Sequence, residues 1–97
     1  MTRPPRSLAE LATDRRARVQ GLACPSSQPD WPRQLAEIGF TPGEMVCVLH
    51  RTGRGGDPMV IRVGTSTFAL RRAEAACVQI EPIEPIEPIE PIERWTG

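Results

Sequence analysis

A strictly periodic segment near the end of the chain limits how much of it can fold. From Ile80 to Glu93 the sequence repeats Ile-Glu-Pro. The repeat matches the three residues per turn of a polyproline II helix, on which Ile, Glu and Pro would each form a stripe. We therefore expect residues 81–97 to be an extended or disordered tail. About 80 of the 97 residues remain to form a core, and a domain of that size buries only about 60% of its unfolded surface.

Charge is divided unevenly between this tail and the body. All 12 basic residues are arginine; residues 1–80 carry eleven of them and seven acidic residues, a net charge of +4. The tail carries five glutamates and one arginine, a net charge of −4. A mildly basic body favours acidic partner surfaces, and the opposite charges permit a weak contact between body and tail that salt would screen. With no block of like basic charge and only four aromatic residues, nucleic-acid binding is not expected.

The cysteines and the absence of long apolar segments indicate the compartment. Cys24, Cys47 and Cys77 are odd in number and widely spaced, which favours reduced thiols over a disulfide framework. No apolar run approaches the roughly 20 residues of a membrane span. The basic residues 1–6 are not followed by the apolar stretch of a signal peptide. We expect a cytoplasmic protein with no direct insertion into a membrane.

Short alternating segments separated by turn residues predict a mainly β fold. Strands are expected at residues 17–22, 45–51, 59–63, 67–72 and 77–80. In the second of these, Val46 and Val48 should face the core, while Cys47 and Leu49 should face the opposite way. Single helical turns are expected at residues 7–11 and 73–76.

One short α-helix is predicted from about Asp30 to Gly39. The Asp30 carboxylate is expected to cap the free N–H groups of the first turn, where Pro32 is tolerated because its missing donor is not needed. Gly39 can adopt the left-handed conformation that ends a helix, with Phe40 folding back onto the last turn in a Schellman motif. The apolar face would comprise three side chains at helical spacing: Trp31, Leu35 and Ile38.

Turn residues separate the helix and the strands. In Thr41-Pro42-Gly43-Glu44, Pro42 presets the first central φ and Gly43 supplies the positive φ of a type II turn. Residues 52–57 contain three glycines and predict a flexible, exposed loop, and residues 64–66 predict a tight turn. Five to six short strands, one short helix and tight turns together predict a small barrel.

The segment 33–43 resembles the FeoA family, in which the pattern R-x-L-x-x-[LM]-G-[LMF]-x-P-G is typical; here it reads RQLAEIGFTPG. The resemblance continues through residues 56–63 and 69–76, and upstream at 7–11 and 17–19. It therefore covers about residues 7–80. Asp14 stands where a turn glycine is common in the family, the loop 24–31 is a little longer, and the Ile-Glu-Pro tail has no counterpart.

This resemblance implies an SH3-like barrel over residues 7–80, between a flexible N-terminus at 1–6 and the tail at 81–97. Such barrels are also similar to the C-terminal domains of iron-dependent repressors. The resemblance further implies an accessory protein of bacterial ferrous iron uptake. Its partner would be a membrane ferrous iron permease, contacted through that permease's cytosolic G-protein domain, as an activator or an assembly factor.

Two exposed segments are candidates for contact with such a partner. The solvent face of the predicted helix would present Arg33, Gln34 and Glu37, although a face of this kind is often only solvated. The loop supplies five further candidates: Gly53, Arg54, Gly55, Gly56 and Asp57. Loops of this kind often carry function, although this one could be a simple hairpin connection. It lacks the G-K-[ST] ending of a phosphate-binding loop.

The sequence contains no constellation that indicates catalysis or a required cofactor. The single histidine, His50, has no second base or nucleophile near it, so an enzyme is not expected. The surface residues that could ligate a divalent metal are His50, Asp57 and Cys24, and they lack metal-site spacing. A metal found on them would be adventitious or would bridge two chains.

Two other functions and one assembly remain compatible with these features. A metal-responsive regulatory domain, like the repressor domains mentioned above, would require a metal site. A generic SH3-like peptide binder would recognise proline-rich segments, and the tail itself has the P-x-x-P register of such ligands. The exposed edge strands of small barrels can pair, so a homodimer is also compatible with the predicted fold.

Overall fold

The computed structural model describes residues 4–52 and 54–83, and the predicted tail beyond Ile83 lies outside them. Five antiparallel strands form one sheet in the order β4-β3-β2-β1-β5. The strands are β1 (Arg16–Leu22), β2 (Met45–Arg51), β3 (Met59–Val63), β4 (Ser66–Leu70) and β5 (Val78–Pro82). The helices are α1 (Trp31–Ile38), α2 (Arg72–Ala75) and the 3₁₀ turns η1 (Leu8–Glu10) and η2 (Arg54–Gly56).

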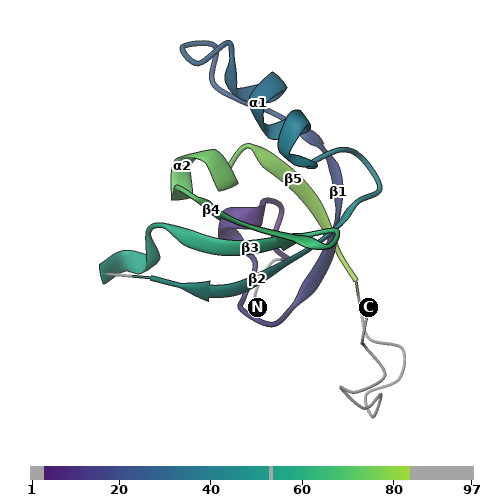
Figure 1. Cartoon of the computed structure of the whole chain (residues 1–97), viewed down its shortest axis with the longest axis vertical. Coiled ribbons are helices and arrows are strands. Elements are labelled where there is room, and N and C mark those ends of the chain that lie inside the picture. The colour runs from purple at the N-terminus through teal and green to yellow at the C-terminus, as the bar shows by residue number, and fades with distance from the viewer. Residues whose placement is uncertain (1–3, 53, 84–97) are drawn as a thin grey trace.

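The sheet curves around one apolar core, and short helical turns cover its open side. The chain passes from β4 to β5 through α2, while η1 contacts both α2 and β5 (Figure 1). Leu8, the first residue of η1, and Leu11, which follows it, are almost completely buried. The largest fully buried side chains come from β2, β3, β5 and the segments next to η1, α1 and α2: Phe40, Leu8, Leu11, Met59, Ile61, Val46, Val48, Val78 and Cys77. The predicted mainly β SH3-like barrel, with one short α-helix over Trp31–Ile38, is confirmed.

The strand boundaries follow the predicted ones closely. β2 and β3 have the predicted bounds, whereas β4 ends at Leu70 because the chain turns there into α2. β5 continues to Pro82, so the first Ile-Glu-Pro unit belongs to the sheet. Pro82 pairs with Ala17 of β1, and the Ile83 N–H donates to the Arg16 carbonyl at 3.0 Å.

The predicted orientation of Cys47 is confirmed, but the residue is buried all the same. Cys47 is on the side of β2 opposite the core, yet it is only 3% exposed, whereas Leu49 is 37% exposed. The cross-strand neighbours of Cys47 are Arg16 on β1 and Arg62 on β3, and long arginine stems readily cover a small side chain. Leu49 lies in the register shift between Val48 and His50, which leaves it without a directly opposite residue on β3.

The predicted side-chain cap by Asp30 is wrong. Asp30 has a helical backbone conformation, and its carboxylate makes no capping hydrogen bond. Its carbonyl instead accepts the Gln34 N–H at 3.1 Å, and the Trp31 N–H donates to the Gln28 carbonyl at 3.2 Å. Pro32 has no N–H at all, so the preceding turn leaves few free donors at the start of α1.

The predicted Schellman motif at the other end of α1 is confirmed. The Gly39 N–H donates to the Ala36 carbonyl at 3.1 Å, and the Phe40 N–H donates to the Leu35 carbonyl at 3.0 Å, the two bonds that define the motif. Gly39 has a φ of +131°, a value that side-chain-bearing residues rarely adopt. Phe40 is completely buried, so the helix ends where its chain enters the core.

The predicted type II turn follows and attaches this segment to β1. The Glu44 N–H donates to the Thr41 carbonyl at 3.0 Å, and Gly43 has a φ of +93°. The Gly43 N–H donates to the Val19 carbonyl, and the Val19 N–H donates to the Glu44 carbonyl, both at 2.8 Å. Asp14, at the family's usual glycine position, also has a positive φ of 65°, which aspartate tolerates better than most residues.

Replacing Phe40 by Ala should destabilise the barrel strongly. Phe40 is 0% exposed, and removing a buried phenylalanine side chain typically costs about 3–5 kcal/mol through lost apolar contact and the cavity left behind. Denaturant unfolding monitored by circular dichroism measures the change. Leu49→Ala is the matched control, because Leu49 is the exposed large apolar residue of β2; equal losses from both variants would contradict the packing described.

Candidate functional site

The solvent face of α1 presents the three predicted polar residues. Arg33, Gln34 and Glu37 are exposed, whereas Leu35 is buried and Ile38 is half-buried. Figure 1 shows α1 standing outside the curved sheet. The described residues provide no hydrogen-bond partner for these three side chains. Their polar groups are therefore accessible from solvent.

The described part of the loop between β2 and β3 is held by hydrogen bonds at its base. Both the N–H and the Oγ1 of Thr52 donate to the Pro58 carbonyl, at 3.0 and 2.7 Å. Within the loop, η2 forms a turn in which Gly55 has a φ of +77°. Gly53 and the Arg54 side chain lie outside the described part of the structure. The predicted loop position is confirmed, and its base is closed by hydrogen bonds.

Asp57 joins this loop to α2. Its Oδ1 accepts the backbone N–H of Arg72 at 3.0 Å, and Arg72 Nη1 lies 3.5 Å from the Gly55 carbonyl oxygen. The Glu74 carboxylate accepts the Arg71 N–H at 2.9 Å. Two carboxylates thus satisfy the first free donors of α2, as capping residues do. Asp57 has a structural partner that the sequence did not indicate.

The loop also contacts the side chain of Arg51. Gly56 has a φ of +72°, and an added Cβ there would lie 3.0 Å from the Arg51 side chain. Arg51 Nη2 donates to the carbonyls of Ala9 and Leu11, at 3.0 and 2.7 Å. The loop therefore lies directly against an arginine that fixes the segment around η1.

The two predicted partner-binding segments remain separate features of the surface. Across residues 4–52 and 54–83, no hydrogen bond joins the exposed face of α1 to the loop around η2. The loop is instead bonded to α2. A partner contacting both segments would have to extend past α2.

The three predicted metal ligands are not brought together. His50 is on β2, Asp57 follows η2, and Cys24 follows β1. Searching the described residues for three or more neighbouring His, Cys, Asp or Glu side chains finds no such group. Asp57 already accepts the Arg72 N–H. These residues do not fit a shared metal site.

The structure instead places Cys24 next to Cys77, which the sequence analysis did not predict. The two cysteines are 53 positions apart, but the Ala23 N–H donates to the Cys77 carbonyl at 2.8 Å. Cys77 is buried, and its Sγ lies 3.5 Å from the Ala73 carbonyl oxygen. Burial, followed by the hydrogen bond with Cys24, raises the pKa of Cys77 to about 12. Burial also raises the pKa of Cys47. Neither buried thiol is suited to act as a nucleophile at neutral pH.

Replacing Asp57 by Ala should lower the free energy of unfolding by about 0.5–2 kcal/mol, the usual cost of losing a capping side chain. Asp57→Asn keeps an oxygen acceptor for the Arg72 N–H and should cost less. Thermal or denaturant unfolding measures both. Asp30→Ala is the matched control, because the Asp30 carboxylate makes no capping bond; a cost for Asp30→Ala as large as for Asp57→Ala would contradict these assignments.

Stability should fall as the pH rises above about 9, the ordinary pKa of the thiol. A raised pKa in the folded state favours folding while the group is protonated, so this contribution is complete below pH 9 and is lost as the pH approaches about 12. The sequence has no lysine and no tyrosine, so thiols dominate titration in this range. Melting temperatures from pH 8 to 10.5 should fall less steeply for Cys77→Ala than for the unaltered protein; parallel curves would refute the role of Cys77.

Comparisons with known proteins show the family and the fold of this chain. The family model of the FeoA domain matches residues 6–82. No curated protein sequence matches the chain significantly. FeoA from Stenotrophomonas maltophilia, solved in complex with zinc, is 33% identical, with a TM-score of 0.70 over 77% of this chain and 88% of that one. It is described as a prokaryotic SH3-domain protein with a proposed role as a bacterial ferrous iron transport activating factor.

Two further solved structures are similar to this chain. FeoA from Chlorobium tepidum is 26% identical, with a TM-score of 0.67 over 86% of this chain and 75% of that one. A manganese-dependent transcriptional repressor in complex with manganese is 19% identical, with a TM-score of 0.70 over 86% of this chain and 39% of that one; this likeness shows the fold alone. Neither helix of the described chain is long and apolar enough to cross a membrane. Since the family match spans the whole barrel, the chain belongs to the FeoA family, which is linked to ferrous iron transport.

Proposed function

We propose that this protein is a non-catalytic accessory protein of bacterial ferrous iron uptake, which regulates a membrane ferrous iron permease by binding its cytosolic G-protein domain. The observation that carries the proposal is the FeoA domain match over residues 6–82, together with 33% identity to a protein proposed to activate ferrous iron transport. Such a protein would act in the cytoplasm, and it would require no resident cofactor.

The exposed face of α1 is the first proposed contact surface. Arg33, Gln34 and Glu37 are solvent-exposed, and the Schellman bonds of Gly39 and Phe40 fix the end of the helix against the core. A contact surface on a fixed helix loses less conformational freedom on binding than one on a flexible segment. The mixed charges of this face suit a polar partner surface.

The loop from Gly53 to Asp57 is the second proposed contact surface. Its base is closed by Thr52 and Pro58, and Asp57 bonds it to α2. These bonds would present the glycine-rich backbone of the loop in one orientation. A partner could approach this backbone closely because glycines have no side chain.

Charge reversal on α1 should weaken binding to the G-protein domain. Purified protein is titrated into the isolated domain of the cognate permease without nucleotide, with GDP, and with a non-hydrolysable GTP analogue. We expect a saturable complex in at least one state, and Arg33→Glu or Glu37→Arg should weaken it about tenfold, which corresponds to about 1.4 kcal/mol. Arg15→Glu is the matched control, because Arg15 is exposed and outside both surfaces.

The result also distinguishes this function from the metal-responsive alternative. No binding in any nucleotide state, to either the isolated domain or the intact permease, would refute the proposal. Calorimetric titration of the protein with Fe²⁺ or Mn²⁺ then tests the alternative. Stoichiometric micromolar binding would favour a metal-responsive regulatory domain, and equal effects of the Arg33 and Arg15 variants would exclude α1 as the contact surface.

A further inference from the structure

Three neighbouring strands place two arginines in one row on the outer face of the sheet. Arg16 on β1 is the cross-strand partner of Cys47 on β2, and Cys47 is the partner of Arg62 on β3. Directly opposed residues of antiparallel strands have their side chains on the same face. Ala17 and Val46, the next residues along β1 and β2, are buried in the core, so the row lies on the opposite, outer face. We call these three residues the Arg16–Arg62 row.

Cys47, at the centre of the row, interacts electrostatically with charged groups on both sides. Arg16 and Arg62 both act electrostatically on the Cys47 thiol, as does Asp14 with the opposite sign. Arg62 Nε also lies 3.4 Å from the Gly64 carbonyl oxygen. Of the charged groups that act on Cys47, two are guanidinium groups and one is a carboxylate, so the centre of the row favours an anionic occupant.

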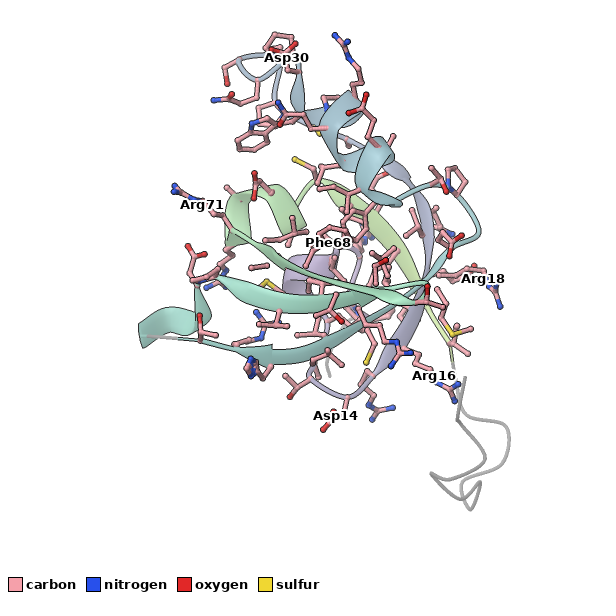
Figure 2. All side chains as sticks on the ribbon, viewed as in Figure 1. Asp14, Arg16, Arg18, Asp30, Phe68 and Arg71 are labelled. Atoms are coloured by element: carbon pink, nitrogen blue, oxygen red, sulfur yellow. The ribbon has the colours of Figure 1, made fainter. Side chains whose placement is uncertain are left out.

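The acidic tail leaves the barrel beside this row. β5 ends at Pro82, and the following Ile83 N–H donates to the Arg16 carbonyl at 3.0 Å. Figure 2 shows Arg16 and Arg18 beside the end of β5. Glu84 therefore directly follows Ile83, whose N–H is bonded to the carbonyl of Arg16, the first arginine of the row. Beyond Ile83 the sequence carries three further glutamates at intervals of three: Glu87, Glu90 and Glu93.

The spacing of these glutamates matches the spacing of the arginines. Neighbouring strands lie about 4.7–4.9 Å apart, so Arg16 and Arg62, separated by one strand, are about 9.4–9.8 Å apart across the sheet. A polyproline II helix rises about 3.1 Å per residue, so residues three apart are separated by about 9.3 Å. A tail crossing the strands in that conformation would present one glutamate to each arginine.

We propose that the Ile-Glu-Pro tail binds the Arg16–Arg62 row of its own barrel, with Glu84 at Arg16 and Glu87 at Arg62. The tail crosses β1, β2 and β3 on the outer face and covers Cys47. Attachment at Ile83 makes the contact intramolecular, with a high effective concentration that compensates for weak individual ion pairs. The proposal concerns contacts within one chain and is independent of the proposed permease partner.

Amide NMR spectra of the full chain test both the contact and its register. At about 0.01 M salt, where the Debye length is about 30 Å, Glu84→Gln with Glu87→Gln should shift the amide signals of the row. Glu90→Gln with Glu93→Gln removes the same charge but should leave those signals nearly unchanged. Raising the salt to about 1 M, where the Debye length is about 3 Å, should move the unaltered protein's signals toward those of the first variant.

Substitution on the barrel supplies the reciprocal test. Arg62→Gln should shift the amide signals of Glu84 and Glu87, whereas Arg33→Gln, on the exposed face of α1, should not. Equal effects of the two glutamate pairs, or of the two arginine variants, would overturn the proposed register. Absence of any salt-dependent shift at Arg16, Cys47 and Arg62 would overturn the contact itself. Glutamine removes the charge and keeps a polar side chain, so each variant should keep the fold, which circular dichroism verifies.

Discussion

The pairing of β1 along both of its edges is the constraint on which the rest of this barrel depends. Its first residues pair with β2, while almost its whole length pairs with β5. Near its centre, Val19 exchanges hydrogen bonds with Gly43 and Glu44 of the turn after α1. One strand thus joins the last strand of the barrel to the segment that carries α1. The orientation of that helix relative to the sheet follows from these bonds and from the burial of Phe40.

Features set by local backbone chemistry could be predicted from the sequence. The glycine and the apolar residue that end α1 are adjacent, and the proline and glycine of the type II turn follow within four residues, so their hydrogen bonds involve only near neighbours. Alternating apolar residues likewise gave the core side of most strands. The cap at Asp30 failed for a local reason as well, because Asp30 has a helical instead of an extended backbone conformation and Pro32 offers no N–H to its carboxylate.

Features that depend on register between distant segments could not be predicted in this way. Cys47 is buried because Arg16 and Arg62 are its neighbours on two other strands. Asp57 was assigned to partner or metal binding, yet it accepts the N–H of Arg72, fifteen residues away. Cys24 and Cys77 meet because the chain beyond β1 still pairs with the start of β5. The contact between Cys24 and Cys77 could be inferred once β1 is known to pair with β5. Antiparallel pairing places the end of β1 beside the start of β5.

The register of β1, β2 and β3 also sets the distance between the two arginines to which we propose that the acidic tail binds. An arginine pair on adjacent strands would be too close to match a three-residue repeat, and a pair on the same strand face would be spaced by about 6.8 Å or its multiples. Only the two-strand separation of Arg16 and Arg62 comes near the polyproline repeat of about 9.3 Å. The first Ile-Glu-Pro unit is already paired with β1, so the sheet fixes where the repeat begins relative to the arginines. A tail with the same composition but a different period would keep its charge and lose this match.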